Sequence, residues 1–71
     1  MSKGYTIMEN ELLKNKIVEY VRENPYVSGF NISMYIKRNP QYTYGFLECL
    51  VEVGRLSVVI KGKTLREYVV L

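Results

Sequence analysis

The 71-residue chain contains no histidine, no aspartate, no tryptophan and no alanine, and its one cysteine is Cys49. Without histidine and aspartate, a Ser-His-Asp triad cannot be assembled. A single cysteine without histidine falls short of the four ligands of a structural zinc site, and it excludes an internal disulfide. A chain this short also has little volume for a catalytic cleft. These absences favour a binding module over an enzyme, with no metal and no small-molecule cofactor.

Long hydrophobic runs are missing as well. No stretch approaches the ~18 consecutive apolar residues of a membrane-spanning helix, and residues 1–8 lack the apolar core of a signal peptide. We therefore expect an intracellular, cytoplasmic protein that does not bind membranes and whose Cys49 stays a reduced thiol. The abundance of asparagine, tyrosine and isoleucine beside the absent alanine is typical of A/T-rich codons, which fits a viral or archaeal genome.

The residues that are present are typical of one small globular domain. Apolar residues make up 48% of the chain and charged residues 24%, which are globular proportions. Ten basic and seven acidic residues give a net charge of +3. This excess permits an anionic partner such as nucleic acid without requiring one. We expect an N-terminal arm over residues 1–8 and one domain over residues 9–71.

Apolar spacing and turn residues predict three helices. Leu13, Ile17 and Val21 recur every four residues, which predicts a helix over residues 9–24. A second helix is expected from residue 28 or 29 to about residue 38, where Asn39-Pro40 stops it. A third is expected from residue 42 or 43 to residue 53, with a left-handed glycine after its end. The residues expected on the buried faces of the second and third helices are Phe30, Ile32, Tyr35, Ile36, Phe46, Leu47, Leu50 and Val51.

The pattern changes to that of β-strands after Gly54. Residues 56–61 and 65–71 are rich in β-branched side chains and flank the turn Lys61-Gly62-Lys63, which predicts a β-hairpin. A short extended segment is expected at residues 26–28. The predicted fold class is therefore α+β, in the order helix, short strand, two helices and a C-terminal hairpin.

Two motifs within this order resemble the winged helix-turn-helix family of DNA-binding domains, in particular its MarR-type members. Residues 47–56 match the pattern Leu-x-x-Leu-x-x-x-Gly-x-Leu, with which that family ends its third helix and begins its wing. Residues 30–36 are similar to its aromatic-x-Leu-small-x-x-Leu helix, with isoleucine at both leucine positions. The resemblance covers residues 9–71 and implies three helices followed by a β-hairpin wing.

The resemblance also implies a double-stranded DNA-binding protein, such as a transcriptional regulator, whose third helix enters the major groove. It places at base edges Gln41, Tyr42, Tyr44 and Gly45. It places at phosphates Lys37, Arg38, Arg55, Lys61, Lys63 and Arg66. Because one such domain covers few base pairs, a homodimer on paired half-sites is expected. Residues 5–8 are the candidate dimer element.

The charge of the third helix departs from the family pattern. Such helices usually expose basic or hydroxyl side chains, whereas residues 41–53 include Glu48 and Glu52 and no basic residue. The two glutamates are four residues apart and so share one helical face, which repels phosphates. Two alternatives therefore stay open: a winged helix that docks a protein through this helix, and a winged helix that binds RNA.

The seven tyrosines suggest a further function, in which their rings stack on the bases of single-stranded nucleic acid. Three of them, Tyr20, Tyr35 and Tyr68, fall where core or core-edge residues are expected. The candidates for exposure are Tyr5, Tyr26, Tyr42 and Tyr44. The spacing of these four tyrosines does not predict one continuous stacking surface, so single-strand binding is less favoured than duplex binding.

Overall fold

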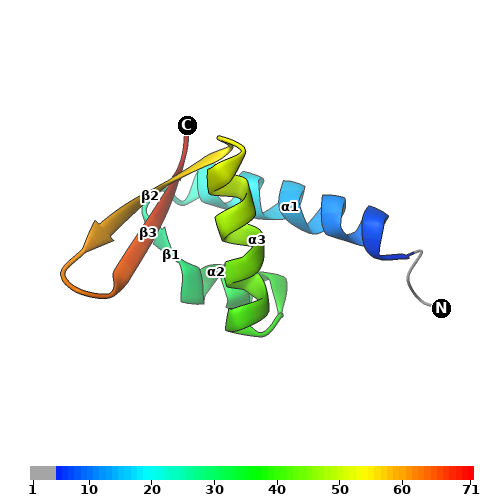
Figure 1. Ribbon diagram of the computed structural model, residues 1–71, viewed down its shortest axis with the longest axis horizontal. Helices are drawn as coiled ribbons and strands as arrows, with labels where there is room; N and C mark the ends of the chain where they lie inside the picture. The colour runs from blue at the N-terminus through cyan, green and yellow to red at the C-terminus, as the bar shows by residue number, and fades with distance from the viewer. Residues whose placement is uncertain (1–4) are drawn as a thin grey trace.

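The structure is a computed structural model that describes residues 5–71, with side chains from residue 10 onward (Figure 1). Its three strands form one antiparallel sheet in the order β1-β3-β2. Three helices followed by a C-terminal hairpin confirm the predicted α+β layout of a winged helix, and the β2–β3 hairpin is the wing. The elements are α1 (Tyr5–Glu23), β1 (Val27–Ser28), α2 (Gly29–Ile36), α3 (Pro40–Glu52), β2 (Leu56–Lys61) and β3 (Leu65–Val70).

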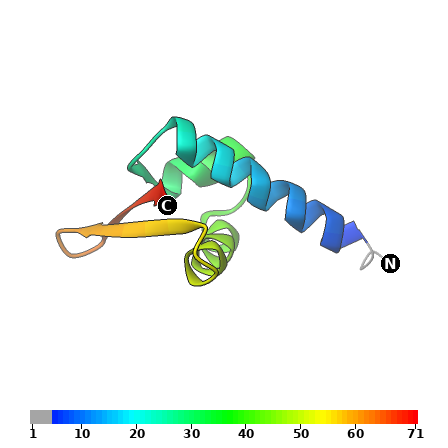
Figure 2. The same cartoon turned by 90° about the horizontal axis from the view of Figure 1, so that it is seen from above.

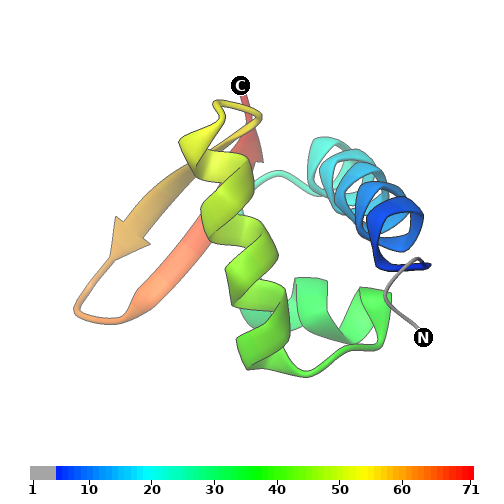
Figure 3. The ribbon, with the colours of Figure 1, turned by 45° about the vertical axis from the view of Figure 1, so that its right-hand side comes forward.

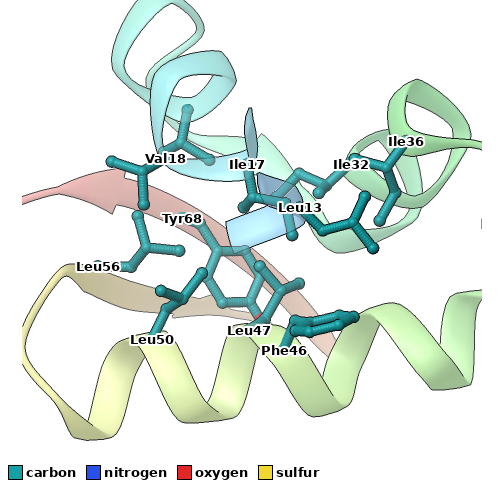
Figure 4. Close-up of a cluster of buried hydrophobic side chains, with 11 residues drawn as sticks. Leu13, Ile17, Val18, Ile32, Ile36, Phe46, Leu47, Leu50, Leu56 and Tyr68 are labelled. Carbon is teal, nitrogen blue, oxygen red and sulfur yellow. The ribbon is translucent and has the colours of Figure 1, made fainter. Parts of the chain in front are cut away.

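One apolar core lies between the helices and the sheet (Figure 4). Figure 2 shows α1 and α3 on opposite sides of the domain, and Figure 3 shows α3 between the wing and α1. Every helix and both hairpin strands send side chains into the core, so α3 is held against the body of the domain with one face outward. The core residues are Leu13, Ile17, Val18, Val21, Ile32, Ile36, Phe46, Leu47, Leu50, Leu56 and Tyr68.

The first helix begins at Tyr5, four residues before the predicted start at residue 9. Residues 5–8 contain neither glycine nor proline, so the helix continues backward through them although their apolar periodicity is weak. The N-terminal half of α1 projects beyond the rest of the domain (Figure 2). Residues 1–4 of the predicted arm lie outside the described residues, and so do the side chains of the candidate dimer element at residues 5–8.

The second helix is shorter than predicted because Lys37 leaves the helical conformation. Lys37 has a φ of 60°, in the left-handed region. Its N–H donates to the Met34 carbonyl at 3.2 Å, and the Arg38 N–H donates to the Ser33 carbonyl at 3.0 Å. This pair of hydrogen bonds is a Schellman motif, whose left-handed position glycine occupies most often. A lysine there carries backbone strain.

We expect the substitution Lys37→Gly to stabilise the fold by about 0.5–1 kcal/mol, because glycine removes the steric cost of the left-handed conformation. Urea denaturation followed by circular dichroism would measure this as a higher midpoint at an unchanged slope. The matched control is Lys37→Ala, which removes the same charge but keeps a Cβ atom. Equal midpoints for the two variants would show that the charge, and not the backbone, sets the effect.

The third helix begins earlier than predicted, at Pro40 instead of residue 42 or 43. The Asn39 side-chain oxygen accepts hydrogen bonds from the N–H groups of Gln41, at 2.7 Å, and Tyr42, at 3.4 Å. Asparagine is a favoured N-cap residue, and proline is suited to the first helical position, where its missing N–H costs nothing. Asn39-Pro40 therefore not only separates the two helices but also starts the second of them.

The turn from α3 into the wing follows the prediction. Gly54 adopts a φ of 85°, and the Arg55 N–H donates to the Leu50 carbonyl at 2.9 Å. The hairpin then pairs Leu56 with Val70 and continues in register to the Lys61–Leu65 pair. This register points alternate strand residues, including Tyr68, toward the core.

Two residues predicted on the buried face of α2 are exposed instead. Ile32 and Ile36 are buried, whereas Phe30 is 56% exposed and Tyr35 is 43% exposed. A helix of two turns buries a single stripe, and the two isoleucines with Ser33 fill it. Tyr35 stacks on Tyr20 with ring centroids 4.0 Å apart, while Phe30 remains open to solvent.

Candidate functional site

The four residues predicted at base edges all lie on the exposed side of the first half of α3. Gln41, Tyr42, Tyr44 and Gly45 are exposed. The opposite side of α3 is buried and fixes the rotation of the helix about its axis. A Cβ atom added at Gly45 would meet nothing within 4 Å, so this position is open to the approach of another molecule. The buried side consists of Thr43, Phe46, Leu47 and Leu50.

The second half of the same exposed face is acidic. Glu48 and Glu52 are exposed, and they continue the row that begins with Gln41 and Gly45, because residues three and four apart lie on one helical face. No basic residue lies within α3. Cations near α3 must therefore come from neighbouring segments.

A hollow of about 520 Å³ separates α3 from the wing, and we refer to it as the wing hollow. One wall comes from the start of α2 and from α3, and the other from the hairpin. Its principal wall residues are Phe30, Tyr44, Glu48, Ile60, Lys63, Leu65 and Arg66. Arg66 also lines a neighbouring hollow together with Glu48 and Glu52, so this residue lies on the side of the wing that faces the acidic half of α3.

The floor of the wing hollow contains Tyr68, which is 3% exposed. Burial raises the pKa of the Tyr68 hydroxyl above its ordinary value of 10.0, and the Arg66 guanidinium opposes that rise. The nearby Tyr44 and Glu48 raise this pKa further. At neutral pH the hydroxyl is therefore protonated, and Tyr68 supplies a neutral polar group among the charges of the walls.

Three of the six cations predicted at phosphates have partners within the protein. Lys61 Nζ lies 3.5 Å from Glu67 Oε1, a buried oxygen that accepts no hydrogen bond; the contact is an ion pair that neutralises the glutamate. Arg55 donates to Asn15 Oδ1 at 3.1 Å and so links the end of α3 to α1. Arg38 donates to the carbonyl groups of Ile36 and Lys37, at 3.4 and 3.3 Å.

The other three predicted cations are Lys37, Lys63 and Arg66. Within residues 10–71, none of the three forms an ion pair. Lys37 lies just before the N-terminus of α3. Lys63 and Arg66 lie across the wing hollow from Tyr44 and Glu48 of α3. These cations thus stand at the end and along one side of the helix whose own face is neutral to acidic.

A second hollow, of about 460 Å³, lies on the other side of α3. It brings Tyr42 and Cys49 of α3 together with Asn10 and Lys14 of α1. Cys49 is half-buried. Tyr42 and Tyr44 therefore lie on opposite flanks of α3 and do not form one aromatic surface.

The described residues hold no group of three or more histidine, cysteine, aspartate or glutamate side chains that could bind a metal ion. None of the helices in that part of the chain combines the length and the hydrophobicity needed to cross a membrane. Comparisons of the chain with protein-family models, with curated proteins and with solved structures found no match.

Proposed function

We propose that the domain binds double-stranded DNA, with the first half of α3 facing the duplex and the wing beside it. The observation that carries this proposal is the position of Lys63 and Arg66, which line the same hollow as Tyr44 of α3. In helix-turn-helix proteins the second helix of the pair meets base edges with its N-terminal residues. Here that segment is exposed and has cations at its end and along its wing side.

Each residue of the first half of α3 has a role that matches its chemistry. Gln41 can form two hydrogen bonds with adenine, and the hydroxyl groups of Tyr42 and Tyr44 can reach phosphate oxygens. Gly45 has no side chain, and nothing lies within 4 Å of the position that a Cβ atom would take, so DNA can approach the helix backbone closely at this point. Lys37, Lys63 and Arg66 are the principal phosphate ligands, because Arg38, Arg55 and Lys61 already hold partners within the protein.

We expect the substitution Lys63→Ala to weaken binding equally for all duplex sequences. It should also lower the slope of log affinity against log salt concentration by about 0.9, the value for one lost phosphate contact. Lys61→Ala should lower the slope less, because Lys61 already neutralises Glu67. Fluorescence anisotropy at several salt concentrations would measure both slopes.

The charge-matched control for this experiment is Lys16→Ala. Lys16 lies on α1, where its Nζ stands 5.3 Å from the centroid of the Tyr35 ring, and it does not line the wing hollow. An equal loss of slope for Lys16→Ala and Lys63→Ala would assign the effect to net charge alone and remove the wing from the DNA interface.

A regulator of transcription is the role that fits this proposal best, and a homodimer would supply the second half-site. The N-terminal half of α1 projects from the domain (Figure 1) and offers a helix for such a dimer contact. The competing function is a protein-docking winged helix, which the exposed pair Glu48 and Glu52 favours. Charge reversal at Glu48 and Glu52 separates the two functions.

A further inference from the structure

We propose that the wing hollow holds one unpaired DNA base, so that the domain prefers a fork or an unpaired nucleotide over fully paired duplex. This inference rests on the proposed DNA-binding function and names the form of DNA that the same surface takes. The acidic half of α3 repels phosphates and so opposes deep insertion of the whole helix between the two phosphate backbones of a duplex. The lining of the wing hollow then indicates what lies there instead.

The wing hollow gathers four large apolar side chains that remain exposed. Phe30 is 56% exposed, Tyr44 41%, Ile60 60% and Leu65 48%. Single exposed apolar residues are common, but a cluster contributed by four elements (α2, α3, β2 and β3) around one hollow marks a binding surface. In the described part of the chain, neither the Phe30 ring nor the Tyr44 ring packs on another aromatic ring. The Tyr44 ring packs against the Gly29 backbone, yet 41% of Tyr44 and 56% of Phe30 stay exposed, and a base can stack on this exposed surface.

The polar groups of the hollow match the remaining parts of a nucleotide. Glu48 lies in the wall beside Tyr44, and a carboxylate accepts hydrogen bonds from the exocyclic amine of a base. Lys63 and Arg66 stand on the opposite wall, where the phosphates on either side of that base would pass. Aromatic rings combined with cations are the usual basis of single-strand binding. A paired base cannot enter, because it is held in the stack of the duplex.

Gly29 fixes the position of one wall. A Cβ atom added at Gly29 would collide with Cε1 of Tyr44. Glycine at the start of α2 therefore lets the Tyr44 ring pack against the backbone and face the hollow. The substitution Gly29→Ala would push this exposed ring aside, which gives a second way to disturb the hollow without changing its charges.

The experiment compares a blunt duplex with the same duplex carrying a short single-stranded deoxycytidine tail, whose bases carry an exocyclic amine, by fluorescence anisotropy at one salt concentration. The tailed duplex is expected to bind about tenfold more tightly, as stacking of a single base allows. Phe30→Ala should remove most of this preference and leave affinity for the blunt duplex unchanged. Phe30→Trp should keep the preference, because the larger ring still stacks. Gly29→Ala should reduce it.

The matched control is Met34→Ala, since Met34 lies on the same helix, is 61% exposed and does not line the hollow. This variant should keep the preference in full. Equal affinities of the wild-type protein for the two DNAs would overturn the base-capture proposal and leave duplex binding intact. Equal weakening of both DNAs by Phe30→Ala would also overturn it. Binding of neither DNA would overturn both proposals, and binding of the tailed DNA alone would support base capture while overturning the duplex proposal.

Discussion

Replacement of Leu47 by alanine is expected to lower the free energy of unfolding by about 3–5 kcal/mol, the cost of a large cavity in a well-packed core. Leu47 is 0% exposed and lies on the buried side of α3 (Figure 4). A domain of this size has a total stability of about 4–10 kcal/mol. The variant should therefore lose a large part of its stability, and urea denaturation followed by circular dichroism would measure the loss.

The control for this substitution is Leu12→Ala. It deletes the same atoms from another helix, at a position that is 66% exposed, and it should change stability by at most about 0.5 kcal/mol. If the two variants were equally stable, α3 would not be seated against the core as described. The exposed face of α3 would then be undefined, and with it the candidate DNA interface.

The sequence predicts the elements well because their signals are local. The spacing of Leu13, Ile17 and Val21 defines the core side of α1, and the Leu47–Leu56 motif predicts both the end of α3 and the start of the wing. Helix ends are predicted less well, because they depend on backbone conformation. Lysine rarely adopts the left-handed conformation, so the sequence does not predict it at Lys37. The structure, but not the sequence pattern, shows that Asn39-Pro40 also caps the start of α3.

In the candidate site, too, the features that depend on local sequence are predictable and those that depend on the folded arrangement are not. The exposure of Gln41, Tyr44 and Glu48 follows from the phase of the α3 apolar pattern, so the sequence predicts it. The wing hollow depends instead on contacts between elements that are far apart in the chain. Phe30 matches a buried position in its helix pattern, yet it lies off the stripe of α2 that Ile32, Ser33 and Ile36 bury. It lines the wing hollow together with Leu65 of the wing. Only the assembled fold brings these two side chains together.

The double substitution Glu48→Lys and Glu52→Lys is expected to raise affinity for duplex DNA by tens of fold at ~0.1 M salt. Both glutamates lie on the exposed face of α3, and on the proposed orientation this face is near phosphates. Two new phosphate contacts would raise the salt slope by about 1.8, and release of the corresponding counterions gives the increase in affinity. Anisotropy titrations at several salt concentrations measure both quantities.

A matched control is available on α1, where Glu19 and Glu23 are also exposed and four residues apart. Glu19→Lys with Glu23→Lys changes the net charge by the same amount. If only net charge mattered, the two double variants would gain affinity equally. Screening limits the effect of a charge to about 10 Å at 0.1 M salt, so a gain confined to the α3 variant would place that face next to the DNA backbone. If the α3 variant gains nothing, the face is remote from DNA, and Glu48 and Glu52 instead mark the surface through which a winged helix docks a basic protein partner.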